Sequence, residues 1–383
     1  MSGRMRILHV VDSLRPGGME NGVVNMAHQL AGTHEVAVAC LRRGGAFETR
    51  LPSSCEVFGL GKGQGFTPGA VWRLAKLIRR WKPDVLHTHN LGTLIYGIAS
   101  RLAGGGGVPI CHGEHGALRP FEMTTKRKLQ RRFLYSRCSL IHGVSRELAD
   151  NLEKEWGLSG PGGVRTVLNG VDCAKFRPAG DGLRAAWDRL GLGPREEEAM
   201  VIGVVARVAP TKRHPFLVDA MERLRQRPGV PPIHLLIVGG EGGAGDALKE
   251  RLAGSPVADH VHWVGFQDAT LTYYQAMDLL AIVSEKEGLS NAMLEAMACG
   301  VPVFSHTACG GAEVLEDGVT GFVREVTGGG SLADGLDPVL RDRAALGAMG
   351  SKARARVQER FSLQAMADNY RALYREAAAG RRF

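Results

Sequence analysis

The sequence predicts an α/β protein made of two doubly wound domains, each built around a parallel sheet. Short runs rich in Val, Ile and Leu alternate along the whole chain with longer segments of helical periodicity. Continuous apolar strands separated by helices are typical of parallel sheets that are buried on both faces. The length of 383 residues also suits two domains better than one core.

Strand-like runs occur in both halves of the chain. In the first half they cover residues 6–11, 35–41, 84–89, 139–144 and 164–169, and in the second half 201–206, 233–239, 260–265, 278–283 and 301–305. Each half opens with a strand, a turn and an amphipathic helix. The apolar positions of these two helices are Val23, Met26, Ala27 and Leu30, and then Leu217, Ala220, Met221 and Leu224. The halves therefore repeat an architecture, although their residues differ.

A polar stretch rich in Gly and Pro separates the halves near residues 175–198, and it is typical of a linker with one short helix. We therefore predict an N-terminal domain at 1–178, a linker at 179–198 and a C-terminal domain at 199–362. A last helix, within 363–383, could pack on either domain.

The composition excludes several classes of protein. No apolar run approaches the roughly 20 residues that cross a bilayer, and the amino terminus offers no signal-peptide cleavage site. The seven cysteines are scattered, which indicates reduced thiols in a cytoplasmic protein. The net charge of +9 favours an acidic partner, such as a phosphorylated ligand or an anionic membrane. Nucleic acid is not expected, because neither zinc-finger spacing nor an aromatic-basic signature is present.

The segment SEKEGLSNAMLEAMACG places two carboxylates, Glu287 and Glu295, around the start of a predicted helix. Ser290 suits the N-cap, and the free amides of the first turn, with the helix dipole, form a site for a phosphate. Carboxylates only accept hydrogen bonds, so they suit hydroxyl groups. A nucleotide sugar carries hydroxyls on both sides of its phosphates. The alternative is that Glu287 is a solvated loop residue and Glu295 a helix-surface residue.

Two cations follow the first strand of the second half, in the segment ARVAPTKRH. Arg207 and Lys212 could bind a diphosphate and neutralise the charge that develops on it when a bond to it breaks. The alternative is a solvated basic turn.

Glycine-rich turns follow two of the strands. Gly17 and Gly18 precede the first helix, where a missing β-carbon lets a ligand approach the backbone. The segment VGGEGGAGD follows the strand at 233–239. The dinucleotide-binding pattern G-x-G-x-x-G is absent after the first strand, and VGGEGGAGD lacks the acidic partner expected on a following strand. No P-loop is present.

Four histidines follow strands of the first half and could lie together: His87 and His89 in LHTHN, and His112 and His115 in CHGEHG. Zinc is one interpretation, and ordinary core or loop histidines are the other. His115 lies latest in its loop, which makes it the best candidate for a ligand contact.

The segment KRKLQRRFLYSR, residues 126–137, holds six cations and no acid. It could bind anionic lipid headgroups or a phosphorylated acceptor. A solvated basic helix face is the alternative.

Together these motifs resemble the retaining, nucleotide-sugar-dependent glycosyltransferases of family 4, which have the GT-B fold of two Rossmann-like domains facing a cleft. The strongest element is E-x7-E, Glu287 to Glu295, within EGLSNAMLEAMACGVPV, followed by R-x4-K, Arg207 and Lys212. The segments LNGVDCAKFRP, GGMEN and EHG also look like family segments, and they occur in the family's order.

The resemblance implies roles for these residues. Glu287 would bind hydroxyls of the donor sugar and Glu295 those of the ribose. Arg207 and Lys212 would stabilise the departing diphosphate, and His115 would contact the donor sugar near the reacting carbon. Further donor contacts would come from residues near these motifs and near the base: Gly17, Gly18, Gly265, Phe266, Gly288, Leu289, Ser290 and Asn291. The last helix, 363–383, would cross back to the N-terminal domain.

The chain reads GLSNA in the loop where many relatives carry Phe or Gly-Leu-Pro, so the donor stays open, with a UDP-sugar favoured. The sequence contains no Asp-x-Asp, the metal-binding motif of the other common glycosyltransferase fold. We therefore expect no cofactor and no metal, with Arg207 and Lys212 supplying the positive charge.

The expected reaction is sugar transfer to a hydroxyl of a glycan or lipid-linked acceptor, in cell-surface polysaccharide or glycolipid synthesis. A cytoplasmic location, with or without peripheral contact at the inner membrane face, fits this reaction. The alternatives are a non-catalytic nucleotide-sugar-binding subunit and an enzyme of another type on the same scaffold, an epimerase or a phosphorylase. A nicotinamide oxidoreductase ranks last, because the dinucleotide fingerprint is missing.

Overall fold

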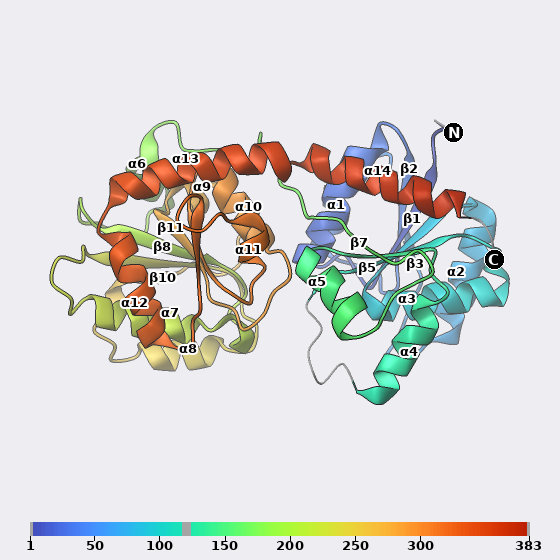
Figure 1. Cartoon of the computed structure of the whole chain (residues 1–383), viewed down its shortest axis with the longest axis horizontal. Helices are drawn as coiled ribbons and strands as arrows, with labels where there is room; N and C mark the ends of the chain where they lie inside the picture. Colours follow the sequence, from blue (N-terminus) through green and yellow to red (C-terminus); the bar gives the residue numbers. More distant parts are fainter. Residues whose placement is uncertain (1–2, 117–123, 381–383) are drawn as a thin grey trace. The chain divides into compact units, whose positions relative to one another are not determined.

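The computed structural model describes residues 3–116 and 124–380, and their contacts divide the chain into two compact units. Unit 1 contains the described residues up to Gly170 together with those from Leu363 onward, and unit 2 contains Val171–Ser362. Both are α/β units (Figure 1). Residues 1–2, 117–123 and 381–383 of the predicted domains lie outside the described residues.

Unit 1 is built on a parallel sheet whose described strands have the order β3-β2-β1-β4-β5-β6-β7. The strands are β1 (Arg6–Val11), β2 (Glu35–Cys40), β3 (Glu56–Gly59), β4 (Val85–His89), β5 (Ile110–Glu114), β6 (Leu140–Gly143) and β7 (Val164–Thr166). The chain builds outward from β1 to one edge and from β4 to the other. Its topological switch point therefore lies between β1 and β4, where doubly wound sheets usually bind ligands.

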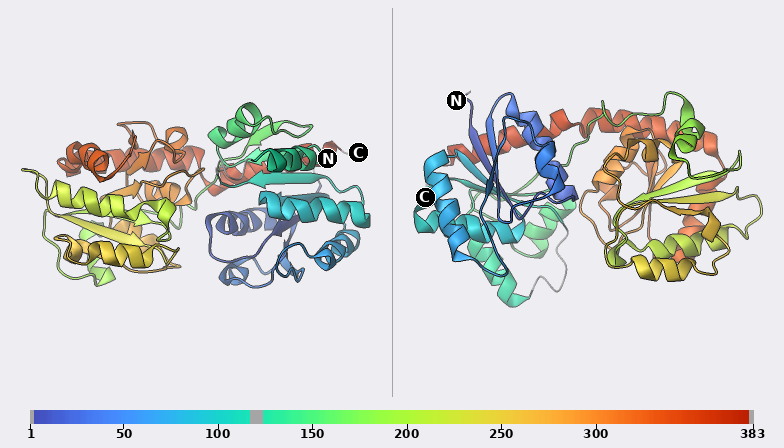
Figure 2. Two further views of the ribbon diagram at one scale, coloured as in Figure 1. Left: turned by 90° about the horizontal axis from the view of Figure 1, so that it is seen from below. Right: turned by 180° about the vertical axis from the view of Figure 1, so that it is seen from behind.

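Helices cover both faces of this sheet, as Figures 1 and 2 show. They are α1 (Gly18–Ala31), α2 (Pro68–Trp81), α3 (Asn90–Ser100), α4 (Thr125–Tyr135), α5 (Arg146–Asp150) and α14 (Leu363–Ala379). Leu8 and Val10 of β1 face a core shared with α2 and α3. Ile7 faces the opposite core, which is shared with α1 and α14. Alternate residues of one strand thus serve two cores, which explains the continuous apolar run.

Unit 2 is built on a second parallel sheet, whose described strands have the order β10-β9-β8-β11-β12-β13. The strands are β8 (Met200–Val205), β9 (Ile233–Val238), β10 (Val261–Trp263), β11 (Leu279–Ile282), β12 (Val303–His306) and β13 (Gly321–Arg324). The switch point here lies between β8 and β11. The prediction of two doubly wound parallel sheets is confirmed.

The helices of unit 2 are α6 (Gly182–Leu190), α7 (His214–Leu224), α8 (Gly245–Leu252), α9 (Leu271–Gln275), α10 (Asn291–Ala298), α11 (Gly311–Val314), α12 (Gly329–Leu340) and α13 (Arg343–Arg360). Buried residues of α7 and α12 pack with Met200, Ile202 and Val204 of β8 in the main apolar core. On α7 these residues include Leu217, Ala220, Met221 and Leu224, which the helical periodicity predicted as its inner face.

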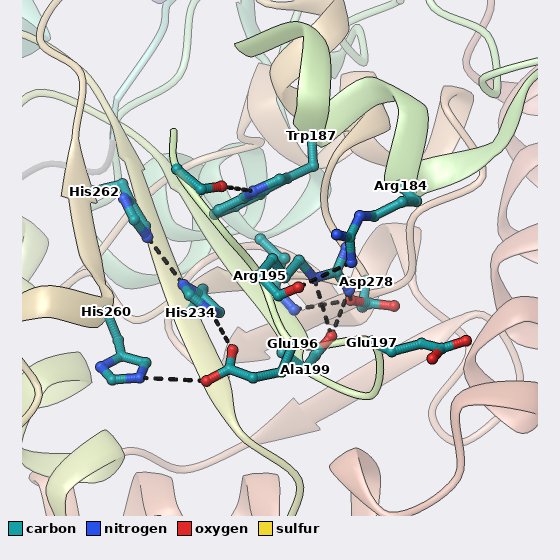
Figure 3. Close-up of polar contacts among 12 residues, drawn as sticks. Arg184, Trp187, Arg195, Glu196, Glu197, Ala199, His234, His260, His262 and Asp278 are labelled. Carbon is teal, nitrogen blue, oxygen red and sulfur yellow. Dashed lines mark hydrogen bonds and ion pairs between the residues drawn. The ribbon is translucent and has the colours of Figure 1, made fainter. Parts of the chain in front are cut away.

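The segment predicted as a linker, 179–198, packs on unit 2 and contains α6. Trp187 of α6 is fully buried, and its ring lies edge-on to those of His234 and His262 (Figure 3). Arg195 pairs with the buried Asp278, which also accepts a hydrogen bond from the Val201 amide, 2.8 Å away, at the start of β8. The segment is therefore a structured part of unit 2.

The boundary of unit 1 also differs from the prediction. Residues 171–178 were assigned to the N-terminal domain, whereas their contacts place them in unit 2. Phe176 is buried there against Tyr274, and Arg354 of α13 donates to the Phe176 carbonyl oxygen. Among the residues described, no helix has both the length and the hydropathy of a membrane span.

Candidate functional site

Most of the predicted site residues of unit 2 lie at the carboxyl edge of its sheet, on both sides of the switch point. Arg207 and Lys212 follow β8, and the loop from Ser284 to Ser290 follows β11. The strands β8 and β11 are hydrogen-bonded neighbours, so the two segments meet at one edge. The Glu285 amide donates to the Thr211 carbonyl oxygen at 2.8 Å, which ties the two loops together.

Lys212 and Glu287 are in direct contact. Lys212 Nζ donates to Glu287 Oε1 across 2.6 Å, and Ser284 Oγ donates to the same carboxylate. The two side chains are 25% and 18% exposed, so the pair is partly shielded but open to a ligand. This contact excludes the alternative in which Glu287 is a free solvated loop residue.

Arg207 lies on the same edge and is exposed. The backbone just before it passes close to Gly239 after β9, where a β-carbon would lie only 1.8 Å from the Ala206 carbonyl oxygen. His214, two residues after Lys212, is buried. Burial, and then the Lys212 charge, lower the pKa of His214 to about 4. His214 is therefore neutral and adds no charge to this edge.

Ser290 is the N-cap residue of α10, and its side chain makes no capping hydrogen bond. The loop before it is held from the other side by Gly310, whose φ of +66° favours glycine. A β-carbon on Gly310 would lie 2.3 Å from the Gly288 carbonyl oxygen. Leu289 is buried, whereas Gly288 and Asn291 are half-buried. The first turn of α10 is thus presented at the sheet edge by a packed loop.

Glu295 lies one turn into α10 and is half-buried. The hydroxyl of the buried Tyr274 donates to Glu295 Oε2 at 2.7 Å. Burial, and then the charge of Glu295, raise the pKa of Tyr274 well above its usual value, so the hydroxyl keeps its proton and remains a donor. Glu295 is therefore a positioned acceptor and not a free helix-surface residue.

Two further turns lie at the ends of β9 and β10. Gly265 has a φ of +72°, which favours glycine, and Phe266 beside it is 55% exposed. The GGEGGAG turn is filled by its own acid. The carboxylate of Glu241 accepts hydrogen bonds from four successive amides, of Gly242 to Gly245, at 2.6–3.0 Å. This turn is therefore already saturated by an anion of the chain itself.

In unit 1, Gly17 and Gly18 follow β1 at the switch point and begin α1, with Gly17 as N-cap. The backbone of Gly17 is extended, a conformation open to any residue. A β-carbon there would meet only the flexible carboxylate of Glu20. This acid in the first turn complements the helix dipole.

The histidine cluster of unit 1 is larger than the sequence predicts. Three of the four predicted histidines also lie inside their strands and not after them. Only His115 follows its strand, whereas His87 and His89 lie inside β4 and His112 lies inside β5. His112 contacts Thr88 and Glu114, away from the other three. Two histidines that the sequence did not single out join the cluster: His9 of β1 and His142 of β6.

A buried ion pair lies beside His112. Arg131 of α4 and the Tyr135 hydroxyl donate to Glu114 Oε1, to which His112 is also close. Burial alone would raise the pKa of Glu114, but its bonds to His112, Arg131 and Tyr135 lower it to about 2. Arg131, one of the six cations of the basic segment, is therefore turned inward, and the segment presents fewer charges than predicted.

Two groups in this cluster are close enough to share a metal ion: His9, His87 and His89, and His87, Cys111 and His142. His9 Nδ1 and both nitrogens of His87 already contact another imidazole or a hydroxyl group at 2.8–3.0 Å. Imidazole is a good ligand for zinc when it is neutral, and burial keeps these rings neutral.

The sequence did not single out Tyr274, His9 and His142 as partners of the site residues. Tyr274 lies in a short helix and His9 in the middle of an apolar strand, so neither belongs to a local motif. A signal exists for His9, because polar residues are rare in buried strands. For Tyr274 the contact with Glu295 depends on packing between elements, which sequence spacing does not encode.

Comparisons with known proteins agree with this architecture. Residues 16–175 match the family model described as Glycosyltransferase Family 4, and residues 193–356 match that of Glycosyl transferases group 1. HepE from Anabaena, solved in complex with UDP-glucose, is similar in fold, with a TM-score of 0.82 and 22% identity. The match covers 97% of this chain and 99% of HepE.

Two curated relatives show how far the similarity extends. D-inositol 3-phosphate glycosyltransferase of Rhodococcus jostii is 31% identical over 213 residues, which are 54% of this chain and only 46% of the relative. The GDP-mannose-dependent alpha-(1-6)-phosphatidylinositol monomannoside mannosyltransferase of Mycolicibacterium smegmatis is 27% identical over 356 residues, 89% of this chain and 90% of the relative. The chain belongs to the family 4 glycosyltransferases and has their GT-B fold of two Rossmann-like domains.

Proposed function

We propose that this chain transfers a sugar from a nucleoside-diphosphate sugar to a hydroxyl group of a glycan or lipid-linked acceptor. The observation that carries the proposal is the contact between Lys212 and Glu287 at the β8/β11 switch point, beside the first turn of α10. A cation, a carboxylate and the amides of a helix N-terminus at one edge suit a ligand with a pyrophosphate next to hydroxyl groups.

Both members of the pair keep capacity for a ligand. A lysine ammonium has three donors, and only one of them is used by Glu287. A carboxylate has about four acceptor positions, of which the bonds from Lys212 and Ser284 use two. Lys212 can therefore bind a phosphate oxygen while Glu287 accepts from sugar hydroxyls.

Breaking the bond between sugar and diphosphate leaves negative charge on the leaving group. Arg207, Lys212 and the amides at Ser290 and Asn291 would stabilise that charge, and losing one such group typically costs about a hundred- to a thousandfold in rate. We propose that these groups act without a metal ion and that the anomeric configuration of the sugar is retained. In unit 1, His115 and the turn at Gly17 and Gly18 would contact the donor.

We favour a UDP-sugar as donor. HepE, which is similar in fold, was solved with UDP-glucose, whereas the mannosyltransferase of M. smegmatis is named for GDP-mannose. A thermal-shift panel of UDP-, GDP- and ADP-sugars tests this preference, because a ligand that binds only the native state raises the midpoint. A shift with none of the three would refute the proposal, and a shift with GDP-sugars alone would refute the UDP preference.

Product analysis separates transfer from its alternatives. Incubation with donor alone yields a free epimer if the chain is an epimerase. A non-catalytic subunit binds donor but releases no nucleoside diphosphate with any acceptor. We expect nucleoside diphosphate release that depends on an added acceptor, and a product whose anomeric proton has the same configuration as the donor by NMR.

We also propose that α4 contacts an anionic membrane that carries the acceptor. On this helix Leu129 and Phe133 are 64% and 54% exposed and lie one turn apart. The exposed cations around them are Lys126, Arg127 and Arg132. Exposed apolar residues bordered by cations are typical of helices that lie in a membrane interface.

Liposome sedimentation tests this contact. We expect binding to anionic but not zwitterionic vesicles, weakened both by Leu129→Gln with Phe133→Gln and by replacing the three exposed cations with Gln. Trp72→Gln, at an apolar residue of α2 that is 61% exposed, is the matched control. Partitioning that is unchanged in both sets of variants would refute the membrane contact.

A further inference from the structure

Three imidazoles of unit 1 form one hydrogen-bonded chain. His9 Nδ1 lies 3.0 Å from His89 Nε2, and His89 Nδ1 lies 2.8 Å from His115 Nε2. The three residues come from adjacent strands, His9 from β1, His89 from the end of β4 and His115 from the residue after β5. His9 and His89 are buried and His115 is half-buried, so this chain of rings reaches the surface through His115.

The three rings are neutral at neutral pH. Burial, and then the charge of His115, lower the pKa of His9 to about 3. Burial lowers the pKa of His115 to about 4, against the attraction of Glu114. Burial likewise holds the pKa of His89 well below its usual value.

Counting protons leaves two arrangements. A neutral imidazole carries one proton on one of its two nitrogens. Three rings therefore carry three protons, two within the hydrogen bonds and one at an end of the chain. Either His9 donates to His89 and His89 donates to His115, with the last proton on His115 Nδ1, or all bonds run the other way, with the last proton on His9 Nε2.

The environment of His9 Nε2 distinguishes the two. This atom is buried and has no hydrogen-bond partner among the described residues. A buried N–H group without an acceptor is among the rarest features of folded proteins, and unsatisfied acceptors are tolerated more often. The arrangement that leaves His9 Nε2 unprotonated is therefore the more stable one.

We infer that the hydrogen bonds of this row of imidazoles are donated outward, from His9 to His89 and from His89 to His115. His115 therefore presents a protonated Nδ1 at the carboxyl edge of the sheet. His89 thereby selects the tautomer that is the less common one in free histidine, and it acts as a positioning residue. The ligand that His115 Nδ1 contacts is therefore a hydrogen-bond acceptor. Under the proposed function, on which this part rests, that acceptor is an oxygen of the donor sugar or its phosphates. In this state His115 Nδ1 cannot take a proton from the acceptor hydroxyl.

The residue next to His89 fixes the backbone of His115. The Asn90 side-chain oxygen accepts a hydrogen bond from the His115 amide at 3.2 Å. Asn90 has a φ of +65°, a left-handed conformation that asparagine tolerates better than most residues. Such strain is often found at functional sites. His89 and Asn90 thus hold the ring and the main chain of the same residue.

The second pair of imidazoles does not interrupt this chain. His87 Nδ1 lies 2.8 Å from the Tyr374 hydroxyl, and His87 Nε2 lies 3.0 Å from His142 Nε2. Both nitrogens of His87 are therefore occupied elsewhere, and the proton count for His9, His89 and His115 can be made separately.

Long-range ¹H–¹⁵N NMR on the full chain labelled with ¹⁵N-histidine tests the inference, with the His115 signals assigned through His115→Gln. We expect protonated Nδ1 and unprotonated Nε2 for His115 in the wild type. His89→Asn, whose amide can still donate to His115 Nε2, should keep this tautomer. His89→Leu should lose it, because His115 Nε2 is then free to carry the proton.

Protonated Nε2 in wild-type His115 would overturn the inference, and this measurement stands even if the variants do not fold. The same tautomer in His89→Asn and His89→Leu would also overturn it. One equivalent of transition metal in the purified protein, lost in His9→Phe, would do so too, because the metal would replace the bond between His9 and His89. If the tautomer is as expected but His115→Gln transfers sugar normally, the proposed role of His115 fails and the hydrogen-bonded chain stands.

Discussion

Acid should destabilise unit 1 long before its carboxylates titrate. His9, His87, His89 and His142 are fully buried, and burial lowers the pKa of each, to about 3 for His9 and well below the usual value for the others. Each ring is neutral in the folded unit but titrates near 6.5 when the chain unfolds. Between these pKa values the unfolded state binds more protons, so stability is complete above pH 6.5 and falls as the pH is lowered.

The size of the effect follows from proton linkage. Going from pH 7.5 to pH 5.5, each such imidazole costs about 1.4 kcal/mol, because the unfolded side chain becomes mostly protonated while the folded one does not. The four contributions add, since all four rings stay neutral in the folded unit. The sum, roughly 5–6 kcal/mol, is comparable with the whole stability of many domains.

Pulsed hydrogen exchange read by mass spectrometry on peptides from β1 and β4 gives the urea midpoint of unit 1 alone. With a slope of about 2 kcal/mol per molar urea, the midpoint should be about 2–3 M lower at pH 5.5 than at pH 7.5. The buried carboxylate of Glu114 does not contribute to this change in midpoint. Its pKa is lowered to about 2, so its contribution to stability is lost only below about pH 4.5. An unchanged or higher midpoint at pH 5.5 would refute the assignment of these histidines as buried and neutral.

The remaining predictions concern the proposed site and the last helix. Arg207→Ala and Lys212→Ala should each lower turnover about a hundredfold or more while the melting temperature changes little; normal turnover in either variant would contradict their role. Exhaustive chelation should leave transfer intact, and a loss restored only by metal would show that a metal is required. Tyr374→Phe removes the bond from α14 to His87 and should cost unit 1 about 1–3 kcal/mol in urea unfolding, unlike Tyr273→Phe in unit 2. No loss in Tyr374→Phe would show that this bond adds nothing to stability.

The strands that the sequence predicts are those with continuous apolar runs, and the structure contains all of them. Three described strands were not among these runs: β3, β5 and β13. β3 (EVFG) and β13 (GFVR) each pair two apolar residues with a charged residue and a glycine, and β5 interrupts its apolar residues with His112 and Gly113. Their apolar signal is therefore weak, and their place in the sheet depends on pairing with strands distant in the sequence.

The same limit applies to the site. The spacing of Glu287 and Glu295 is local, so the motif could be read from the sequence. The partners that position them, Ser284 excepted, come from other elements, as Tyr274 and Lys212 do. Arg131 is a further contact that the sequence does not reveal. Nothing in a run of cations indicates that one of them turns inward to Glu114.

Calorimetric titration of UDP and GDP into the wild type, Lys212→Met and Lys352→Met tests most directly whether the β8/β11 edge binds a pyrophosphate. Lys352 is an exposed lysine of α13 and serves as the matched control. We expect one nucleoside diphosphate per chain in the wild type and in Lys352→Met. Affinity should be at least about tenfold weaker in Lys212→Met, since a charge-assisted hydrogen bond contributes about 1.5–3 kcal/mol. Equal affinity in Lys212→Met, or no binding of either diphosphate to the wild type, would contradict the account.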